Sequence, residues 1–156
     1  MSITYFDTSA LVKKYVNELG TQQTLEFFAD MEMAGTAMIT QAEMASALSR
    51  ASRMGKLDEN EAKNAWEVFL VDWESLYLIE ITKPLMSRAG TLAWEEKLRG
   101  YDAVHLAAVL AWRETLDLDI TLATFDEELW NAAKRLEFAV FPKDLPGILE
   151  LRQPSS

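Results

Sequence analysis

The run from Arg99 to Trp112 constrains the fold more than any other part of the sequence. Its apolar residues recur at helical spacing, at Val104, Leu106, Ala107, Leu110 and Ala111. A single carboxylate, Asp102, stands at the head of this run, two residues after Gly100. An ionised carboxylate at the edge of a buried helix is costly unless something compensates its charge. The sequence therefore predicts that Asp102 has a partner that compensates its charge.

Short β-branched or aromatic segments alternate with helical patterns along the chain. The predicted strands are 2–6, 36–40, 76–81, 119–124 and 138–142, the last of them an edge strand ended by a proline. The predicted helices are 10–16, 21–33, 40–55, one that begins at 58, 82–97, 99–112 and one that begins at 126. This order favours an α/β fold with a mostly parallel central sheet of four to five short strands. We expect 1–150 to form a single domain and 151–156 to be a flexible tail.

The composition narrows the chemistry that is available. The chain has no cysteine, which excludes thiolate nucleophiles and cysteine-bound zinc, and one histidine, which excludes a multi-histidine metal site. No glycine-rich phosphate loop, secretory signal pattern or membrane-length apolar run is present in the sequence. We therefore expect a cytoplasmic protein. The net charge of −10 argues against a broad basic nucleic-acid surface, but it is compatible with a cation site built from carboxylates.

Four acidic residues occupy positions from which they could converge: Asp7, Glu43, Asp102 and Asp126. Three of them follow predicted strands, and Asp102 opens a helix. Each also has a local explanation as a helix cap or a first-turn acid. Because the carboxyl ends of parallel strands meet at one edge, where helices also begin, the four side chains are expected to share a pocket. Their mutual repulsion would be offset by a divalent cation, and oxygen ligands favour Mg²⁺ or Mn²⁺ over Zn²⁺. The expected partner of Asp102 is therefore such an ion, shared with Asp7, and not a basic residue.

A carboxylate-bound cation of this kind suits phosphodiester hydrolysis. It can polarise the phosphate, lower the pKa of a bound water and stabilise charge on the leaving oxygen. The hydroxyls of Ser9 and Thr124 could orient the water or a phosphate oxygen, or support the acids. For Thr8, helix capping is the favoured interpretation.

Four segments resemble the PIN domain, and most of all the VapC-type toxins of toxin–antitoxin pairs. They are FDTSAL at 6–11, Glu43 within TQAEM at 40–44, YDAVHLAA at 101–108, and ATFDEELW at 123–130. The resemblance implies a three-layer fold and a Mg²⁺- or Mn²⁺-dependent ribonuclease that cleaves RNA by metal-activated water. It implies that Asp7, Glu43, Asp102 and Asp126 hold the metal, although Glu127 or Glu128 could replace Asp126. It also implies an antitoxin partner, and commonly a homodimer.

Several other features allow alternative interpretations. His105 matches the family pattern, but we interpret it as a packing residue and leave it out of the site. Basic residues that could compensate the acids for RNA binding are Lys13, Lys14, Arg50, Arg53 and Lys56. The five tryptophans are expected in the core or at an interface, and the two helices between Gln41 and Trp73 form a candidate groove or dimer face.

Two functions other than a ribonuclease are also compatible with this sequence. A receiver-like signalling domain also gathers acids and Mg²⁺ at strand ends, but it normally has an adjacent acidic pair after the first strand and a lysine after a later one. Here Asp7 is followed by Thr8 and Ser9, and no lysine directly follows Thr124. The second alternative is a catalytically inactive PIN fold that acts as a protein-binding module.

Overall fold

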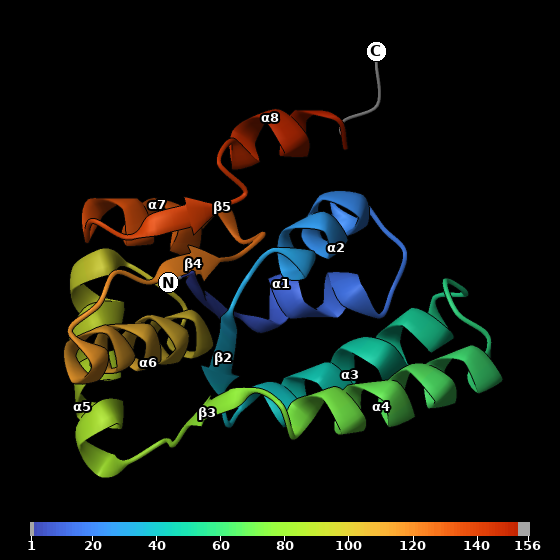
Figure 1. The fold of residues 1–156 in the computed structure, drawn as a ribbon, viewed down its shortest axis with the longest axis horizontal. Coiled ribbons are helices and arrows are strands. Elements are labelled where there is room, and N and C mark those ends of the chain that lie inside the picture. The colour runs from blue at the N-terminus through green and yellow to red at the C-terminus, as the bar shows by residue number, and fades with distance from the viewer. Residues whose placement is uncertain (1, 153–156) are drawn as a thin grey trace.

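The computed structural model describes residues 2–152 and contains one sheet of five parallel strands (Figure 1). The strands are β1 (Ile3–Phe6), β2 (Met33–Ala37), β3 (Tyr77–Ile79), β4 (Thr121–Ala123) and β5 (Ala139–Phe141). Their order across the sheet is β3-β2-β1-β4-β5, and every neighbouring pair is parallel. The α/β class, the parallel sheet and the edge position of the last strand are confirmed.

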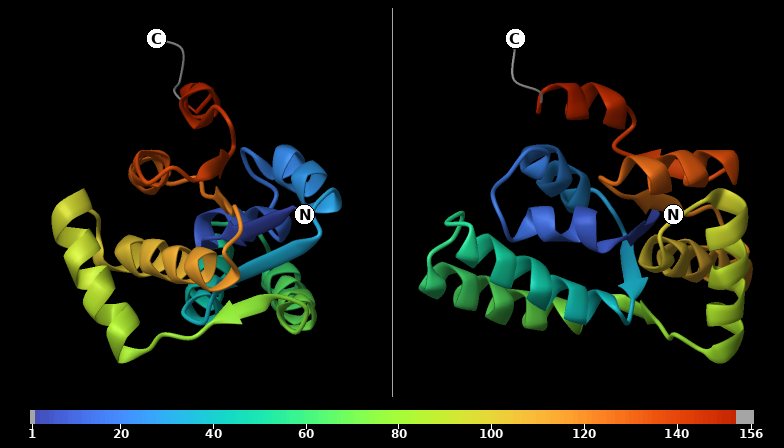
Figure 2. Two further views of the ribbon diagram at one scale, coloured as in Figure 1. Left: turned by 60° about the vertical axis from the view of Figure 1, so that its left-hand side comes forward. Right: turned by 180° about the vertical axis from the view of Figure 1, so that it is seen from behind.

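Helices cover both faces of this sheet (Figures 1 and 2). They are α1 (Thr8–Leu11), the 3₁₀ turn η1 (Val12–Lys14), α2 (Thr21–Ala29), α3 (Thr40–Arg53), α4 (Glu59–Trp73), α5 (Lys83–Glu96), α6 (Gly100–Leu116), α7 (Glu127–Arg135) and α8 (Leu145–Glu150). One buried cluster joins the sheet to α5, α6 and α7, and a second joins it to α1, α3 and α4. The fold therefore has three layers.

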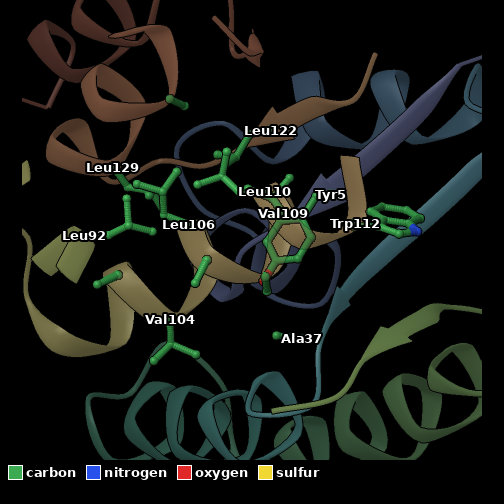
Figure 3. Packing of buried hydrophobic residues seen from close by; sticks show 14 of the residues in the cluster. Tyr5, Ala37, Leu92, Val104, Leu106, Val109, Leu110, Trp112, Leu122 and Leu129 are labelled. Atoms are coloured by element: carbon green, nitrogen blue, oxygen red, sulfur yellow. The ribbon is translucent and has the colours of Figure 1, made fainter. Parts of the chain in front are cut away.

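Strand alternation assigns side chains to the two layers. Tyr5 packs in the cluster beneath α6, whereas the next residue, Phe6, packs in the cluster on the opposite face, where its ring stacks on Phe28. Figure 3 shows side chains of α6, among them Leu106 and Leu110, close to Tyr5 on β1 and Leu122 on β4. Most residues of α6 are buried, as its apolar pattern predicts.

Several helix starts follow from local capping chemistry. Asp58 caps α4 in a capping box with Glu61. The hydroxyl of Thr82 accepts a hydrogen bond from the first turn of α5, which also holds a proline where its missing N–H costs nothing. Asp126 caps α7 in the same way. These helix starts are confirmed because they depend on residues only a few positions apart.

Several predicted boundaries are wrong, among them the end of the helix predicted at 99–112, which continues to Leu116 as α6. The second strand is 33–37 and not 36–40, because its register is set by pairing with β1, which places Ile3 beside Met33, and Thr40 instead starts α3. The helix predicted at 21–33 ends at 29 to make room for this strand. The helix predicted at 10–16 starts at 8, where Asp7 caps it, and continues as a 3₁₀ turn.

The C-terminal part contains one helix that was not predicted. Pro146 and Gly147 suggest a loop, yet the proline lies in the first turn of α8 and Asp144 caps the helix at the amide of Gly147. Residues 151–152 form a turn after α8, and the predicted fraying of 153–156 lies outside the described residues. None of the helices within 2–152 is both long and apolar enough to cross a membrane.

The tryptophans divide into two groups. Trp73, Trp112 and Trp130 are buried in the two clusters, as predicted. Trp94 on α5 is 89% exposed, so it is not a core residue, and its placement at an interface remains a prediction.

Candidate active site

A cavity at the carboxyl edge of the sheet contains all four predicted acids. It measures about 160 Å³ and is lined by Asp7, Thr8, Ser9, Glu43, Arg99, Tyr101, Asp102, His105 and Asp126. We call it the acid cavity. Its lining comes from four separate parts of the chain: the end of β1 with α1, the first turn of α3, the start of α6 and the cap of α7. This is the edge at which open α/β sheets bind their ligands.

Asp7 is the most firmly held of the four acids. It follows β1 directly and is 3% exposed. Its Oδ1 accepts hydrogen bonds from Ser9 Oγ at 2.7 Å and from the Ala10 amide at 3.0 Å, and its Oδ2 accepts one from Thr124 Oγ1 at 2.6 Å. Burial raises the pKa of Asp7, although nearby His105 and these three donors oppose the rise.

Glu43 is oriented by two donors on a single carboxylate oxygen. Its Oε1 accepts from Thr8 Oγ1 at 2.9 Å and lies 2.8 Å from His105 Nε2. Burial would raise the pKa of Glu43, but the hydrogen bond and charge of His105 and the hydroxyl of Thr8 outweigh it, so the pKa is lowered. The carboxylate is therefore held ionised, with Oε2 left without a protein donor among the described residues.

His105 is itself held by a buried phenol. Its Nδ1 lies 2.6 Å from Tyr5 Oη, and both side chains are almost completely buried. Burial, and then the negative charges of Asp7 and Glu43, raise the pKa of Tyr5, so the phenol keeps its proton. Because the Glu43 carboxylate can only accept, Nε2–H donates to Glu43. His105 thus connects β1 with α3 through its two ring nitrogens.

Asp102 and Asp126 share one guanidinium. Arg99 Nε lies 3.0 Å from Asp102 Oδ2, and Arg99 Nη2 lies 2.5 Å from Asp126 Oδ2. The other oxygen of Asp126 accepts from the amide of Leu129 as the cap of α7. Burial and the negative charge of Asp126 raise the pKa of Asp102 to about 6, although Arg99 opposes the rise.

A family model described as the PIN domain matches residues 4–135. The chain belongs to the PIN domain family. Among curated proteins, it is similar to Ribonuclease VapC45 of Mycobacterium tuberculosis (strain CDC 1551 / Oshkosh). The two are 33% identical over 148 residues, which cover 93% of this chain and 99% of that protein.

Solved structures agree on the PIN fold. The structure of PAE2754 from Pyrobaculum aerophilum is similar with a TM-score of 0.62 and 21% identity, and the match covers 96% of this chain and 90% of that chain. A chain of VapBC2 from Rickettsia felis, bound to a DNA fragment from their promoter, is similar with a TM-score of 0.58 and 17% identity. That match covers 88% of this chain and 96% of that chain. At these identities the likeness concerns the fold.

The structure distinguishes Asp126 from the two glutamates that follow it. Asp126 lines the acid cavity, whereas neither Glu127 nor Glu128 does, and Glu128 faces a different cavity beside Glu95. The cause is local: the capping residue of α7 turns toward the carboxyl edge, while the next two residues already lie on the helix. Asp126 and the two glutamates, which the sequence left open as alternative metal ligands, thus lie in different places.

The three hydroxyl residues near the acids, Thr8, Ser9 and Thr124, differ in what they contact. Thr8 does not cap α1, because Asp7 does, and its side chain instead reaches Glu43. Thr124 is fully buried and is not part of the cavity lining, and its hydroxyl donates to Asp7. Ser9 lines the cavity and also donates to Asp7.

The basic residues singled out in the sequence do not reach the acids. Lys13 forms an ion pair with Glu18, and Lys14 forms one with Asp72. None of the five basic residues singled out in the sequence lines the acid cavity; they are Lys13, Lys14, Arg50, Arg53 and Lys56. Arg99 lies there instead. It was missed because its role depends on Asp126, which is 27 residues away.

The donor chemistry of the acid cavity fits a hard divalent cation. All four acids offer carboxylate oxygens, and the described residues provide no protein donor to Glu43 Oε2 or Asp102 Oδ1. As they are arranged within 2–152, no three acidic or histidine side chains form a ready ligand cluster. Arg99 contacts one oxygen of Asp102 and one of Asp126.

Proposed function

We propose that this PIN domain chain is a Mg²⁺- or Mn²⁺-dependent endoribonuclease, the toxin of a toxin–antitoxin pair, acting in the cytoplasm. The observation that carries the proposal is the meeting of Asp7, Glu43, Asp102 and Asp126 in one cavity at the carboxyl edge of the sheet. The 33% identity to a protein named Ribonuclease VapC45, over nearly the full length of both, supports the same activity.

The four acids would hold the metal, which when bound supplies Lewis acidity and an activated water. The chain's own residues prepare these oxygens. Three donors fix both oxygens of Asp7, so its orientation is set before a ligand arrives. His105 and Thr8 fix one oxygen of Glu43 and leave the other available. Asp102 is attached to the buried helix α6, which gives it a rigid support.

The receiver-like alternative is less well supported by the site. No lysine belongs to the lining of the acid cavity, and β1 is followed by a single acid with two hydroxyl residues. An inactive PIN fold would have no need for four acids with arranged hydrogen-bond donors. The nuclease function therefore accounts for more of the observed contacts.

Metal removal tests the proposed activity. The purified chain is expected to cleave single-stranded or looped RNA with Mn²⁺ or Mg²⁺ and to stop in excess chelator, with activity restored when the ion is added back. Sequencing RNA 5′ ends after expression, with and without the neighbouring gene, would reveal both the cleavage sites and inhibition by an antitoxin. Cleavage that persists in chelator would contradict a metal-dependent mechanism.

A basic antitoxin protein and a second copy of the chain are the proposed partners. The strongly acidic composition suits a basic partner. Helices α3 and α4 lie side by side and extend away from the sheet (Figures 1 and 2). Exposed apolar residues here are Met54, directly after α3, and Val68 and Val71 on α4. The VapBC2 structure, which is similar in fold, supports a toxin–antitoxin assembly.

Removal of the His105 N–H that donates to Glu43 is expected to weaken metal binding. His105→Leu leaves Glu43 Oε1 with one donor, and Tyr5→Phe removes the phenol that holds Nδ1 of His105. We expect about tenfold weaker Mn²⁺ binding in the first variant and a smaller loss in the second, because supporting hydrogen bonds orient metal ligands. Isothermal titration of Mn²⁺ into each folded variant measures the effect without reference to cleavage.

A matched control separates this effect from general destabilisation. Thr24 is a fully buried hydroxyl that donates to the Gly20 carbonyl, away from the acid cavity. Thr24→Val should lower stability with unchanged Mn²⁺ affinity. His105→Gln should recover part of the affinity if its amide reaches Glu43. Equal Mn²⁺ affinity in His105→Leu and the parent chain would exclude the positioning role.

A further inference from the structure

Arg99 is the one arginine or lysine among the residues that line the acid cavity. It precedes α6 in an extended conformation, so its side chain is not part of the helix surface. The side chain is 55% exposed, which leaves it room to move, while the Asp102 carboxylate that it contacts is 4% exposed. A single, half-exposed arginine side chain thus lies in a cavity lined by four acids.

The guanidinium has contacts on two sides. It donates one N–H to Asp102 and one to Asp126. On the other side it lies over the ring of Tyr101, 4.8 Å from the ring centroid, in a cation–π contact. A guanidinium has five N–H donors, so three remain available for another group while these contacts last. Tyr101 is itself half exposed and lines the same cavity.

The two carboxylates bound by Arg99 are also proposed metal ligands. A divalent cation and the guanidinium would compete for the same two carboxylates and would repel each other. The ion has twice the charge in a smaller volume, so it is expected to displace the guanidinium. The displaced group would remain close to the cavity, because its backbone begins α6 and the Tyr101 ring offers a surface for it.

An RNA phosphate approaching this cavity meets a strongly acidic surface. Among the lining residues, only Arg99 offers a permanent positive charge in a planar arrangement that matches two phosphate oxygens. The charge that balances Asp102 and Asp126 in the metal-free protein is therefore well placed to bind phosphate once a cation has replaced it.

Building on the proposed nuclease function, we propose that Arg99 is a phosphate-binding residue that exchanges partners. In the metal-free protein it pairs with Asp102 and Asp126, and when the divalent cation takes these carboxylates it turns to the RNA phosphate at the cavity. This exchange keeps the acidic site charge-compensated before binding and recruits the same guanidinium for the substrate afterwards.

Arg99→Gln is expected to change metal binding and RNA cleavage in opposite directions. Without RNA, we expect about fivefold tighter Mn²⁺ binding by isothermal titration, because a half-exposed competing ion pair has been removed. At saturating Mn²⁺, we expect about a 100-fold slower single-turnover cleavage of a single-stranded RNA, because a positioned charge donor is lost. Arg99→Lys should keep more of the RNA affinity than of the cleavage rate.

Arg88 provides a matched control. It forms a two-pronged ion pair with Glu114, at 2.8 and 2.6 Å, between α5 and α6, and it does not line the acid cavity. Arg88→Gln removes the same kind of charge and should leave both Mn²⁺ affinity and cleavage unchanged. A purely structural role of Arg99 would lower Mn²⁺ affinity and cleavage together.

The outcomes separate this proposal from the proposed function. Mn²⁺ binding by Arg99→Gln that is unchanged or weaker would overturn the exchange, and cleavage at the parental rate would overturn the phosphate role. A parent chain that binds Mn²⁺ but cleaves no RNA would contradict the nuclease function and the phosphate role with it. The Mn²⁺ affinities would then still decide whether Arg99 competes for the carboxylates.

Discussion

Asp102→Asn is expected to reduce metal-dependent RNA cleavage by at least about 10³-fold, because removal of a central active-site group lowers the catalytic rate by this much or more. The same substitution is expected to stabilise the metal-free protein at neutral pH. Asp102 is 3% exposed, and burial together with the charge of Asp126 raises its pKa to about 6. Above that pH the buried carboxyl is ionised at a cost, which the neutral amide avoids.

The sign of this stability effect depends on pH. The folded pKa of Asp102 lies above its value of 3.8 in the unfolded chain, so its favourable contribution is complete below about pH 4 and is lost as pH rises through 6. We expect Asp102→Asn to gain about 1 kcal/mol at pH 7.5, after allowing for the lost contact with Arg99, and little at pH 4.5.

Chemical denaturation at both pH values, without metal, measures this difference. Asp30→Asn changes an exposed carboxylate at the end of α2 and should alter neither stability nor cleavage. An Asp102→Asn variant that cleaves at the parental rate would contradict the assignment of the metal ligands. A stability gain of equal size at both pH values would contradict the raised pKa.

Gly35→Ala is expected to destabilise the protein by about 2 kcal/mol, as overpacking of a filled core does. A Cβ at this position would lie 2.5 Å from Cη2 of Trp112, a side chain that is 2% exposed. The indole cannot easily move, because it is stacked on Tyr77 with ring centroids 5.2 Å apart. Since Trp112 belongs to α6, a shift of this helix would also displace Asp102 and weaken Mn²⁺ binding.

Gly90→Ala is the matched control for this substitution. Gly90 lies in α5, and a Cβ there would meet nothing within 4 Å. The change should stabilise the protein by about 0.5–1 kcal/mol, because alanine is the better helix former. Urea denaturation of the two variants should therefore give shifts of opposite sign, and equal shifts would show that Gly35 is not tightly packed against Trp112.

The site was partly predictable from the sequence. Asp7, Glu43 and Asp126 could be placed at strand ends because strand periodicity and helix capping are local properties. His105 could not be assigned, because its contacts are with Tyr5, 100 positions away, and Glu43, 62 positions away. Its spacing of three residues from Asp102 was a signal, since two residues so spaced lie on the same side of a helix.

The sequence by itself determined the types of element, most helix starts and the positions of the four acids, because these depend on side-chain periodicity and on contacts within one helical turn. Only the tertiary structure decided the order of the strands, the register of β2 and the pairing of Asp102. The sequence predicted a metal ion shared with Asp7, and not a basic residue, as the partner of this buried charge. In the metal-free fold the partner is instead Arg99, which Asp102 shares with Asp126. Arg99 is only three residues from Asp102, but its second partner, Asp126, reaches it because α6 and α7 meet at one edge of the sheet, which no local pattern encodes.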